Sequence, residues 1–204
     1  MQKKGILLVL SGPSGAGKGT VCQGLIKSSS SMELSISVTT RESRPGEENG
    51  KNYFFISKEE FHQMLEEDQL LEYAKVYDNY YGTPRRWVEE KLEQGEDVLL
   101  EIDIQGALQI KNKFPESILI FVVPPSINEL QARLIRRGTD RDDVIQKRLG
   151  CVQGELQEIP KYDYIVVNDK LEDAVDEVTA ILKAEKCRPK RFSLQKYLQT
   201  GGLS

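Results

Sequence analysis

Gly12-Pro13-Ser14-Gly15-Ala16-Gly17-Lys18, followed by Gly19 and Thr20, is the stretch of this chain that decides the fold. An apolar run at residues 6–10 precedes it and indicates a short buried strand, and apolar residues at helical spacing follow it at positions 21, 22, 25 and 26. A glycine-rich turn between a strand and a helix lets backbone N–H groups point at an anion, and the lysine can reach the β- and γ-phosphates of a nucleotide. Residues 12–20 are therefore predicted to bind nucleotide phosphates.

The end of this loop departs from the usual pattern, in which serine or threonine directly follows the lysine. Gly19 occupies the hydroxyl position, and Thr20 comes one residue later. Thr20 can hold Mg²⁺ directly or through water, and the alternative is that it only begins the helix. Both roles stay open at this point.

Composition and charge fit one soluble enzyme. The 204 residues can bury a full core with smaller appended lobes, and a net charge of −4 argues against binding nucleic acid through overall charge. Three cysteines, at positions 22, 151 and 187, are too few and too widely spaced for a disulfide framework or a zinc site. No apolar stretch is long enough to cross a membrane. We therefore expect a cytoplasmic protein without nucleic-acid or membrane partners.

Short apolar runs alternate with helical patterns, which predicts the α/β class with a parallel sheet covered by helices on both faces. The expected core strands are residues 6–10, 34–38, 98–102, 118–123 and 164–167. The core is assigned to residues 1–36, 95–127 and 158–204. Two insertions complete the chain: a small α/β lobe at 37–94, and a helical, arginine-rich segment at 128–157 with a break at Gly138-Thr139. In the lobe, Ser57 and Glu60 have the spacing of a capping box for a helix from about Lys58.

Several motifs, taken together, support a family resemblance. The chain contains, in this order, Gly12-Pro-Ser-Gly-Ala-Gly-Lys18, Ser37-Val-Thr-Thr-Arg-Glu-Ser-Arg-Pro-Gly46, Gly50-Lys-Asn-Tyr-Phe-Phe55, Tyr80-Tyr-Gly-Thr-Pro84, Glu101-Ile-Asp-Ile-Gln-Gly106 and Arg137-Gly-Thr139. They resemble the signatures of guanylate kinases, and the similarity covers nearly everything from residue 5 to about residue 169. The resemblance implies ATP + GMP ⇌ ADP + GDP with Mg²⁺, and dGMP as a further acceptor. It also implies a P-loop kinase core, a GMP-binding lobe at 37–94 and a lid at 128–157.

By this resemblance, Ser37, Glu72, Thr83 and Asp103 bind the guanine base. Guanine presents two adjacent donors, N1–H and the exocyclic amine, beside the acceptor O6, so carboxylates suit the donors and a hydroxyl suits O6. Adenine has an acceptor nitrogen in place of N1–H, which would leave a desolvated carboxylate unpaired at a cost of about 1–3 kcal/mol or more. Taken alone, either acid is better explained as a solvated surface residue, because only folding can bring them together.

The resemblance assigns the GMP phosphate to Arg41, Arg44, Tyr53 and Tyr81. The two arginines lie three residues apart before a Pro-Gly turn, and guanidinium groups match phosphate oxygens in bidentate geometry. The tyrosines can add neutral hydroxyl donors. Taken alone, Tyr53 is equally well explained as a core aromatic residue of its strand, whereas Tyr81 in a glycine-containing turn is harder to explain by packing.

The segment at 128–157 carries a cluster of arginines. Arg133 and Arg137 share a helix face by their spacing, and Arg148 lies on the next segment. Arginine-rich helices are usually solvated faces. Phosphoryl transfer, however, depends mostly on positioning and positive charge, because the transition-state charge spreads over the equatorial oxygens. Lys18, Arg137 and Arg148 are therefore the candidate catalytic residues, with Arg133 nearer the ATP phosphates.

Two other functions remain alternatives. The chain could be a related kinase of the same fold that acts on another nucleotide or a sugar phosphate, against which the base-binding residues argue. It could also be a non-catalytic interaction module, since guanylate-kinase-like domains of animal scaffolding proteins bind peptides; Lys18 and the arginines of 128–157 argue against this. The basic segment at 186–191 fits either a solvated tail or a helix docked on a neighbouring subunit, so a homo-oligomer is an alternative to a monomer.

Overall fold

The computed structural model describes residues 4–29, 31–76, 78–136 and 142–192. Its centre is a five-stranded parallel sheet in the order β2 (Met32–Leu34), β7 (Asp97–Glu101), β1 (Leu7–Ser11), β8 (Ile118–Val123) and β9 (Tyr164–Val167). Its three central strands are nearly continuous apolar runs, as expected of parallel strands buried on both faces. The predicted α/β class with a parallel sheet is therefore confirmed.

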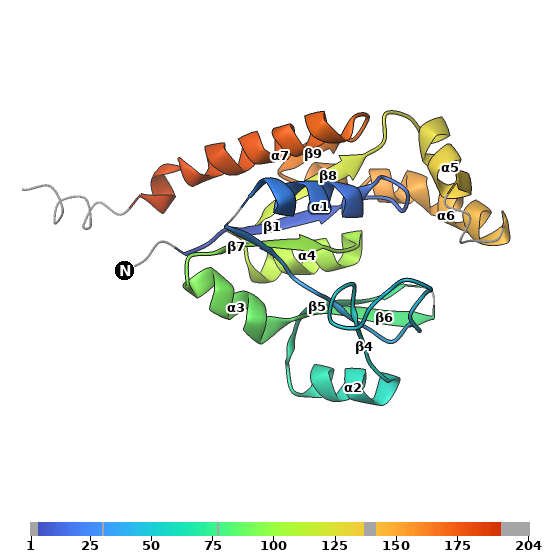
Figure 1. Cartoon of the computed structure of the whole chain (residues 1–204), viewed down its shortest axis with the longest axis horizontal. Helices are drawn as coiled ribbons and strands as arrows, with labels where there is room; N and C mark the ends of the chain where they lie inside the picture. The colour runs from blue at the N-terminus through green and yellow to red at the C-terminus, as the bar shows by residue number, and fades with distance from the viewer. Residues whose placement is uncertain (1–3, 30, 77, 137–141, 193–204) are drawn as a thin grey trace, which may run out of the picture.

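Helices cover both faces of this sheet: α1 (Lys18–Ser28) and α7 (Leu171–Lys186) on one, and α3 (Arg85–Glu93) and α4 (Ile104–Lys113) on the other (Figure 1). Leu8 and Leu10 of β1 pack in the core beneath α1 and α7, whereas Leu7 and Val9 pack against α3 and α4. Successive side chains of a strand point to opposite faces, so one short apolar strand contributes to both cores. The sheet and its helices thus form a rigid scaffold, and functional residues can lie on the loops at the edge of the sheet.

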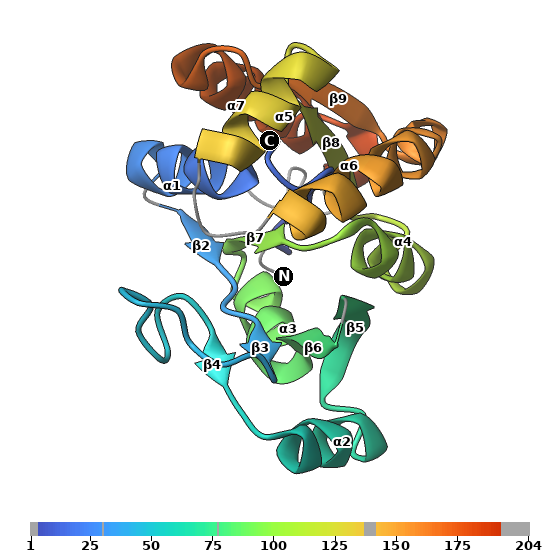
Figure 2. The same cartoon turned by 90° about the vertical axis from the view of Figure 1, so that its right-hand side faces the viewer.

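A second sheet, called the small sheet below, has the order β4 (Phe54–Phe55), β3 (Val38–Thr39), β6 (Asn79–Pro84) and β5 (Leu70–Val76). Strands β3 and β6, and β6 and β5, pair antiparallel, whereas β3 and β4 are parallel. Val38, Phe61 and Leu70 form its own buried cluster, to which α2 (Lys58–Glu66) contributes Phe61. Figure 2 shows the small sheet and α2 together at the lower end of the molecule.

Four of the five predicted core strands match observed strands to within one residue. The fifth, predicted at 34–38, is wrong. The chain leaves the five-stranded sheet after Leu34, which pairs with Leu99, and enters the small sheet at Val38, which pairs with Phe54 and Gly82. One apolar stretch is thus divided between two sheets, because its two ends meet different partners.

The local helix signals are largely confirmed. Ser57 accepts a hydrogen bond from the N–H of Glu60 at 3.1 Å, and the Glu60 carboxylate accepts one from the N–H of Ser57 at 2.7 Å, which completes the predicted capping box. The arginine-rich insertion forms α5 (Ile127–Arg136) and α6 (Asp142–Leu156), followed by a 3₁₀ turn at Ile159–Lys161. Gly138-Thr139, the predicted break, lies outside the described residues.

The basic residues at the end of α7 and just after it make ion pairs with their own chain. Lys186 pairs with the buried Asp97 at 2.6 Å, Arg188 with Glu185 at 2.7 Å, and Lys190 with Glu116 at 2.6 Å. In the described ranges, every helix is too short or too polar to cross a membrane.

Candidate functional site

Several candidate site residues lie at the carboxyl edge of the five-stranded sheet, and the others lie on or beside the small sheet. The chain runs from β1 to β2 on one side of β1, whereas β8 and β9 lie on the other, and α/β proteins bind ligands in the crevice at such a switch point. The phosphate-binding loop follows β1, Asp103 follows β7, and Asn168 follows β9. Parts that are far apart in the sequence therefore end at one edge.

The phosphate-binding loop requires glycine at specific positions. Gly12 and Gly17 have φ angles of 138° and 87°. A Cβ on Gly12 would lie 2.2 Å from the carbonyl oxygen of Val122, and one on Gly17 would lie 2.3 Å from Nδ2 of Asn168. Asn168 also donates to the carbonyl of Ala16 at 2.8 Å, so the carboxyl end of β9 fixes the curvature of the loop.

Lys18 lies over this loop. Its Nζ donates to the carbonyl oxygens of Gly12 at 2.6 Å and Pro13 at 3.1 Å, which holds the ammonium group within the turn. Burial lowers the pKa of Lys18, and the carboxylates of Glu101 and Glu155 partly offset that effect.

Helices α5 and α6 bring two of the predicted arginines to the loop. Nη1 of Arg148 donates to Oγ of Ser14 at 2.6 Å. Nη1 of Arg133 lies 3.7 Å from the position of a Cβ on Gly17, and its Nε donates to Glu129 at 2.9 Å. Arg137, the third predicted arginine, lies outside the described residues.

The groups around the loop fit Mg²⁺ that is bound mainly through a nucleotide. Thr20 is exposed in the first turn of α1, and the carboxylate of Glu101 packs beside the loop, 3.3 Å from the position of a Cβ on Gly19. In the described part of the chain, no three His, Cys, Asp or Glu side chains are grouped as a metal site. Mg²⁺ usually keeps several waters and takes one or two protein oxygens plus substrate phosphates, so this donor set suits it.

Glu72, Thr83 and Asp103 are called the base cluster below; Glu72 and Asp103 lie beside Gly106, and Thr83 contacts Glu72. The Thr83 hydroxyl donates to the buried Glu72 carboxylate at 2.6 Å, and Asp103 caps α4 by accepting from the N–H of Gly106 at 2.8 Å. A Cβ on Gly106 would lie 2.2 Å from Oε2 of Glu72 and 3.4 Å from Oδ1 of Asp103. The absence of a side chain at Gly106 therefore lets the two carboxylates approach each other.

Both carboxyl groups of the base cluster have raised pKa values. Burial, opposed by the hydrogen bond from Thr83 and reinforced by the nearby Asp103, raises the pKa of Glu72 to about 7. Burial also raises the pKa of Asp103, against the hydrogen bond from Gly106 and the charge of Lys18. A pair of desolvated carboxylates is stabilised by a ligand that brings its own adjacent N–H donors.

Ser37 completes this group through strand pairing. Val38 lies opposite Gly82 in the antiparallel β3–β6 ladder, so the preceding residue, Ser37, is brought next to Thr83. All four residues assigned to the base by resemblance thus lie around one place between α4 and the small sheet.

Arg41, Arg44, Tyr53 and Tyr81, called the phosphate cluster below, lie at the other end of β3 and β6. The Tyr53 and Tyr81 rings are 5.9 Å apart in an edge arrangement, and Cζ of Arg41 lies 5.5 Å from the centroid of the Tyr53 ring. Burial, together with the nearby Glu101 and Tyr81, raises the pKa of Tyr53 to about 12. Tyr53 contacts these side chains and stays outside the apolar clusters of both sheets, which disfavours its interpretation as a core aromatic.

Three residues at the site carry functional contacts that the sequence reasoning missed. Glu47 binds Arg41, Asn168 holds the phosphate-binding loop, and Glu101 influences both Lys18 and Tyr53. Glu101 and Asn168 each stand at or just after the end of a predicted buried strand, which is where α/β proteins place ligands. Glu47 follows a Pro-Gly turn, which indicates that the chain folds back on the arginines before it.

A cavity of about 740 Å³ opens at the opposite, amino-terminal edge of the sheet and includes none of these residues. Two of its basic lining residues, Lys186 and Lys190, are paired with Asp97 and Glu116.

Comparisons with known proteins agree with this geometry. A family model described as guanylate kinase matches residues 4–185. A guanylate kinase from Caldanaerobacter subterraneus subsp. tengcongensis is 55% identical over 191 residues, 94% of this chain and 93% of that protein. One from Oceanobacillus iheyensis is 50% identical over 205 residues and the full length of both chains.

Solved structures extend the comparison to three dimensions. The crystal structure of guanylate kinase from Anaplasma phagocytophilum superposes with a TM-score of 0.82 at 34% identity, covering 98% of this chain and 96% of that one. A shikimate kinase from Bacteroides thetaiotaomicron, at 15% identity and a TM-score of 0.50, shares the fold alone. Because the family model and the relatives at half identity span nearly the whole chain, this protein belongs to the guanylate kinase family.

Proposed function

We propose that this protein transfers the γ-phosphoryl group of ATP to GMP, giving ADP and GDP, and that it accepts dGMP as well. The observation that carries the proposal is the base cluster, in which the Glu72 and Asp103 carboxylates approach each other around Gly106, with the Thr83 hydroxyl bound to Glu72. We assign residues 37–94 as the GMP-binding lobe, 128–157 as the lid, and the rest of the chain as the core.

The base cluster suits guanine better than adenine. Two carboxylates can accept from N1–H and the exocyclic amine, while the hydroxyl of Ser37 can donate to O6; the Thr83 hydroxyl donates its hydrogen to Glu72. Adenine would face the ionised Glu72 with an acceptor nitrogen, so its buried charge would gain no donor from the base beyond the hydrogen bond from Thr83. A desolvated polar group left unpaired costs about 1–3 kcal/mol, and a charge costs more. This difference is the proposed basis of acceptor choice.

The reaction then needs positive charge and correct placement. Arg41, Arg44, Tyr53 and Tyr81 hold the GMP phosphate, whose oxygen is already an anionic nucleophile and needs no general base. Lys18, Arg148 and Arg137 face the transferring phosphoryl group, and Arg133 lies nearer the ATP phosphates. Phosphoryl transfer has a loose transition state, so such positioning is most of the catalysis.

Mg²⁺ bound with ATP supplies further positive charge at the β- and γ-phosphates. Thr20 and Glu101 are the protein groups proposed to hold the ion, directly or through water. Their support is the oxygen-only donor set beside the phosphate-binding loop.

We also propose that the protein works in the cytoplasm. Cys22, Cys151 and Cys187 are all free thiols, which suits a reducing compartment.

A coupled assay of ADP formation tests the function. With ATP and Mg²⁺, turnover is expected to require GMP or dGMP, and Lys18→Met is expected to lower kcat at least about a hundredfold while the protein stays folded. Retained turnover in Lys18→Met would contradict the role of the loop. A folded wild-type protein that binds ATP but turns over no acceptor would instead favour the interaction module.

A further inference from the structure

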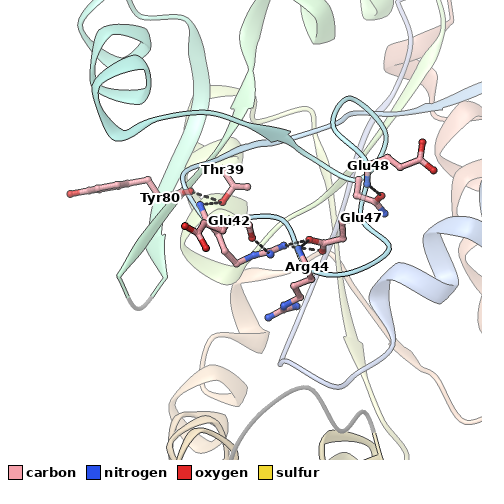
Figure 3. A network of polar contacts seen from close by, with 8 residues as sticks. Thr39, Glu42, Arg44, Glu47, Glu48 and Tyr80 are labelled. Atoms are coloured by element: carbon pink, nitrogen blue, oxygen red, sulfur yellow. Dashed lines mark hydrogen bonds and ion pairs between the residues drawn. The ribbon is translucent and has the colours of Figure 1, made fainter.

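Glu47 closes the loop that carries the two arginines of the phosphate cluster. Gly46, with φ 86°, turns the chain so that the N–H of Glu47 donates to the carbonyl of Arg44 at 3.0 Å. In return, the Glu47 carboxylate accepts from the N–H of Arg44 at 2.7 Å (Figure 3). Backbone and side chain of one residue thus fix the backbone of Arg44 from both sides.

The same carboxylate binds the guanidinium of Arg41. Nη2 of Arg41 donates to both Glu47 oxygens at 2.9 Å, and its Nη1 donates to the carbonyl of Glu42 at 2.6 Å. The Arg41 and Glu47 side chains are only 14% and 18% exposed, so this ion pair is far less solvated than those of the surface. Burial alone would favour the neutral acid, but the bonds from Arg44 and Arg41 outweigh it and lower the pKa of Glu47.

The side chain of Arg44, unlike that of Arg41, is not bound to Glu47. Within the described ranges, its guanidinium makes no hydrogen bond or ion pair, and Figure 3 shows it extending away from Glu47. One arginine is therefore held by its side chain and the other by its backbone, and the second guanidinium is available to an anion.

We infer that Glu47 is a positioning residue for phosphate binding: it holds Arg41 and the backbone of Arg44 so that both guanidinium groups meet the phosphate of the acceptor nucleotide together. The inference rests on the proposed function, because it assumes that the phosphate cluster binds GMP. It predicts the opposite of simple electrostatics. A carboxylate near an anion site repels the anion, so a Glu47 that only competed with phosphate would strengthen GMP binding when its charge was removed.

The test compares Glu47→Gln and Glu47→Ala with Glu48→Gln as the matched control. Glu48 is the next residue, its exposed carboxylate pairs among the described residues only with Lys51 at 2.5 Å, and its change alters net charge equally. Dissociation constants for GMP and for guanosine, which lacks the phosphate, are measured by titration, together with kcat and the KM for each substrate. Thermal unfolding checks that each variant is folded, and Glu47→Gln keeps the side-chain volume if Glu47→Ala is unstable.

A positioning role gives a phosphate-specific loss. Glu47→Gln is expected to weaken GMP binding and raise the KM for GMP about tenfold, the effect of one lost charge-assisted contact, and Glu47→Ala more. Guanosine binding, the KM for ATP and all constants of Glu48→Gln stay near wild type. Unchanged or tighter GMP binding in a folded Glu47→Gln, or an equal loss for guanosine, overturns the inference. Whether wild type and Glu48→Gln turn over GMP tests the proposed function separately from the role of Glu47.

Discussion

At the scale of single residues, Glu72 is an acidic side chain that is buried within the site. It is 3% exposed, and burial raises its pKa to about 7, so a large share of the free protein carries it protonated near neutral pH. When Glu72 is protonated, its O–H would face the N–H donors of guanine, and two donors do not form a hydrogen bond with each other. GMP binding should therefore require the ionised form and draw the equilibrium toward it.

This gives a pH dependence with a definite sign. Below pH 7 the raised pKa leaves Glu72 mostly neutral, so GMP affinity should fall about tenfold from pH 8 to pH 6 through this group. Glu72→Gln should bind GMP more weakly at pH 8, by roughly ten- to a hundredfold, and lose this part of the pH dependence. Isothermal titration at several pH values measures both.

The GMP phosphate also titrates near pH 6, which changes GMP affinity with pH independently of Glu72. The pH profile of Glu72→Gln measures this contribution of the phosphate. Parallel pH profiles for wild type and Glu72→Gln would show that Glu72 does not ionise on binding.

Sequence alone supported these residues unequally. Lys18 was predicted from the loop that contains it, because the glycines, the lysine and the flanking elements are contiguous. Glu72 and Asp103 lie 31 positions apart, and only the family resemblance joined them before the structure brought both to Gly106. Glu47 was missed, because a charged residue after a Pro-Gly turn looks like ordinary surface until its partner is known.

At the scale of elements, α4 and β5 hold the two halves of the base cluster at a fixed spacing. Asp103 caps α4, and Glu72 lies on β5. Gln109 of α4 joins them, since its amide donates to the carbonyl of Tyr73 at 2.6 Å and accepts from the N–H of Tyr73 at 3.2 Å. Lys113, one turn later, donates to the carbonyl of Leu71 at 2.7 Å. The backbone on both sides of Glu72 is thus tied to the helix that carries its partner.

Gln109→Ala should loosen this connection. The KM for GMP is expected to rise several-fold, with the KM for ATP unchanged, because two hydrogen bonds of about 1 kcal/mol each position only the base cluster. The amide hydrogen of Tyr73 should exchange faster with solvent. Gln63→Ala is the control, since Gln63 is exposed on α2 and, within the described ranges, its side chain bonds only Glu67. Equal changes in both variants would argue against a role for the α4–β5 connection.

A strand could be predicted from the sequence where the whole apolar run joins a single sheet. The strands at 118–123 and 164–167 were located to the residue because both lie entirely in one sheet. The run at 34–38 was wrongly predicted as one strand because hydrophobic periodicity indicates which residues are buried but not which sheet they join. The pairing of Leu34 with Leu99 and of Val38 with Gly82 is a property of the tertiary fold.

At the scale of the whole molecule, the groups around the phosphate-binding loop are linked to more than one region of the chain. Arg148 of α6 already contacts Ser14, and Glu101 acts electrostatically on both Lys18 and Tyr53 of the small-sheet region. The acceptor and the donor nucleotide would therefore lie between parts of the chain that can approach further. Closure on both substrates would exclude water and prevent loss of ATP to hydrolysis.

Small-angle scattering measures this closure. The radius of gyration is expected to decrease when a bisubstrate analogue joining adenosine and guanosine is added, and to change less with either nucleotide alone. Identical scattering curves with and without the analogue would mean that the site is assembled without lobe movement.

Acceptor selectivity is the measurement to make first. Initial rates of ADP formation from ATP and Mg²⁺ give kcat/KM for GMP and for AMP under identical conditions. A site built to pair guanine's donors with Glu72 and Asp103 predicts a ratio of at least about a thousandfold in favour of GMP. Comparable values for the two acceptors, or a preference for another acceptor, would contradict the assignment of these carboxylates to the guanine base.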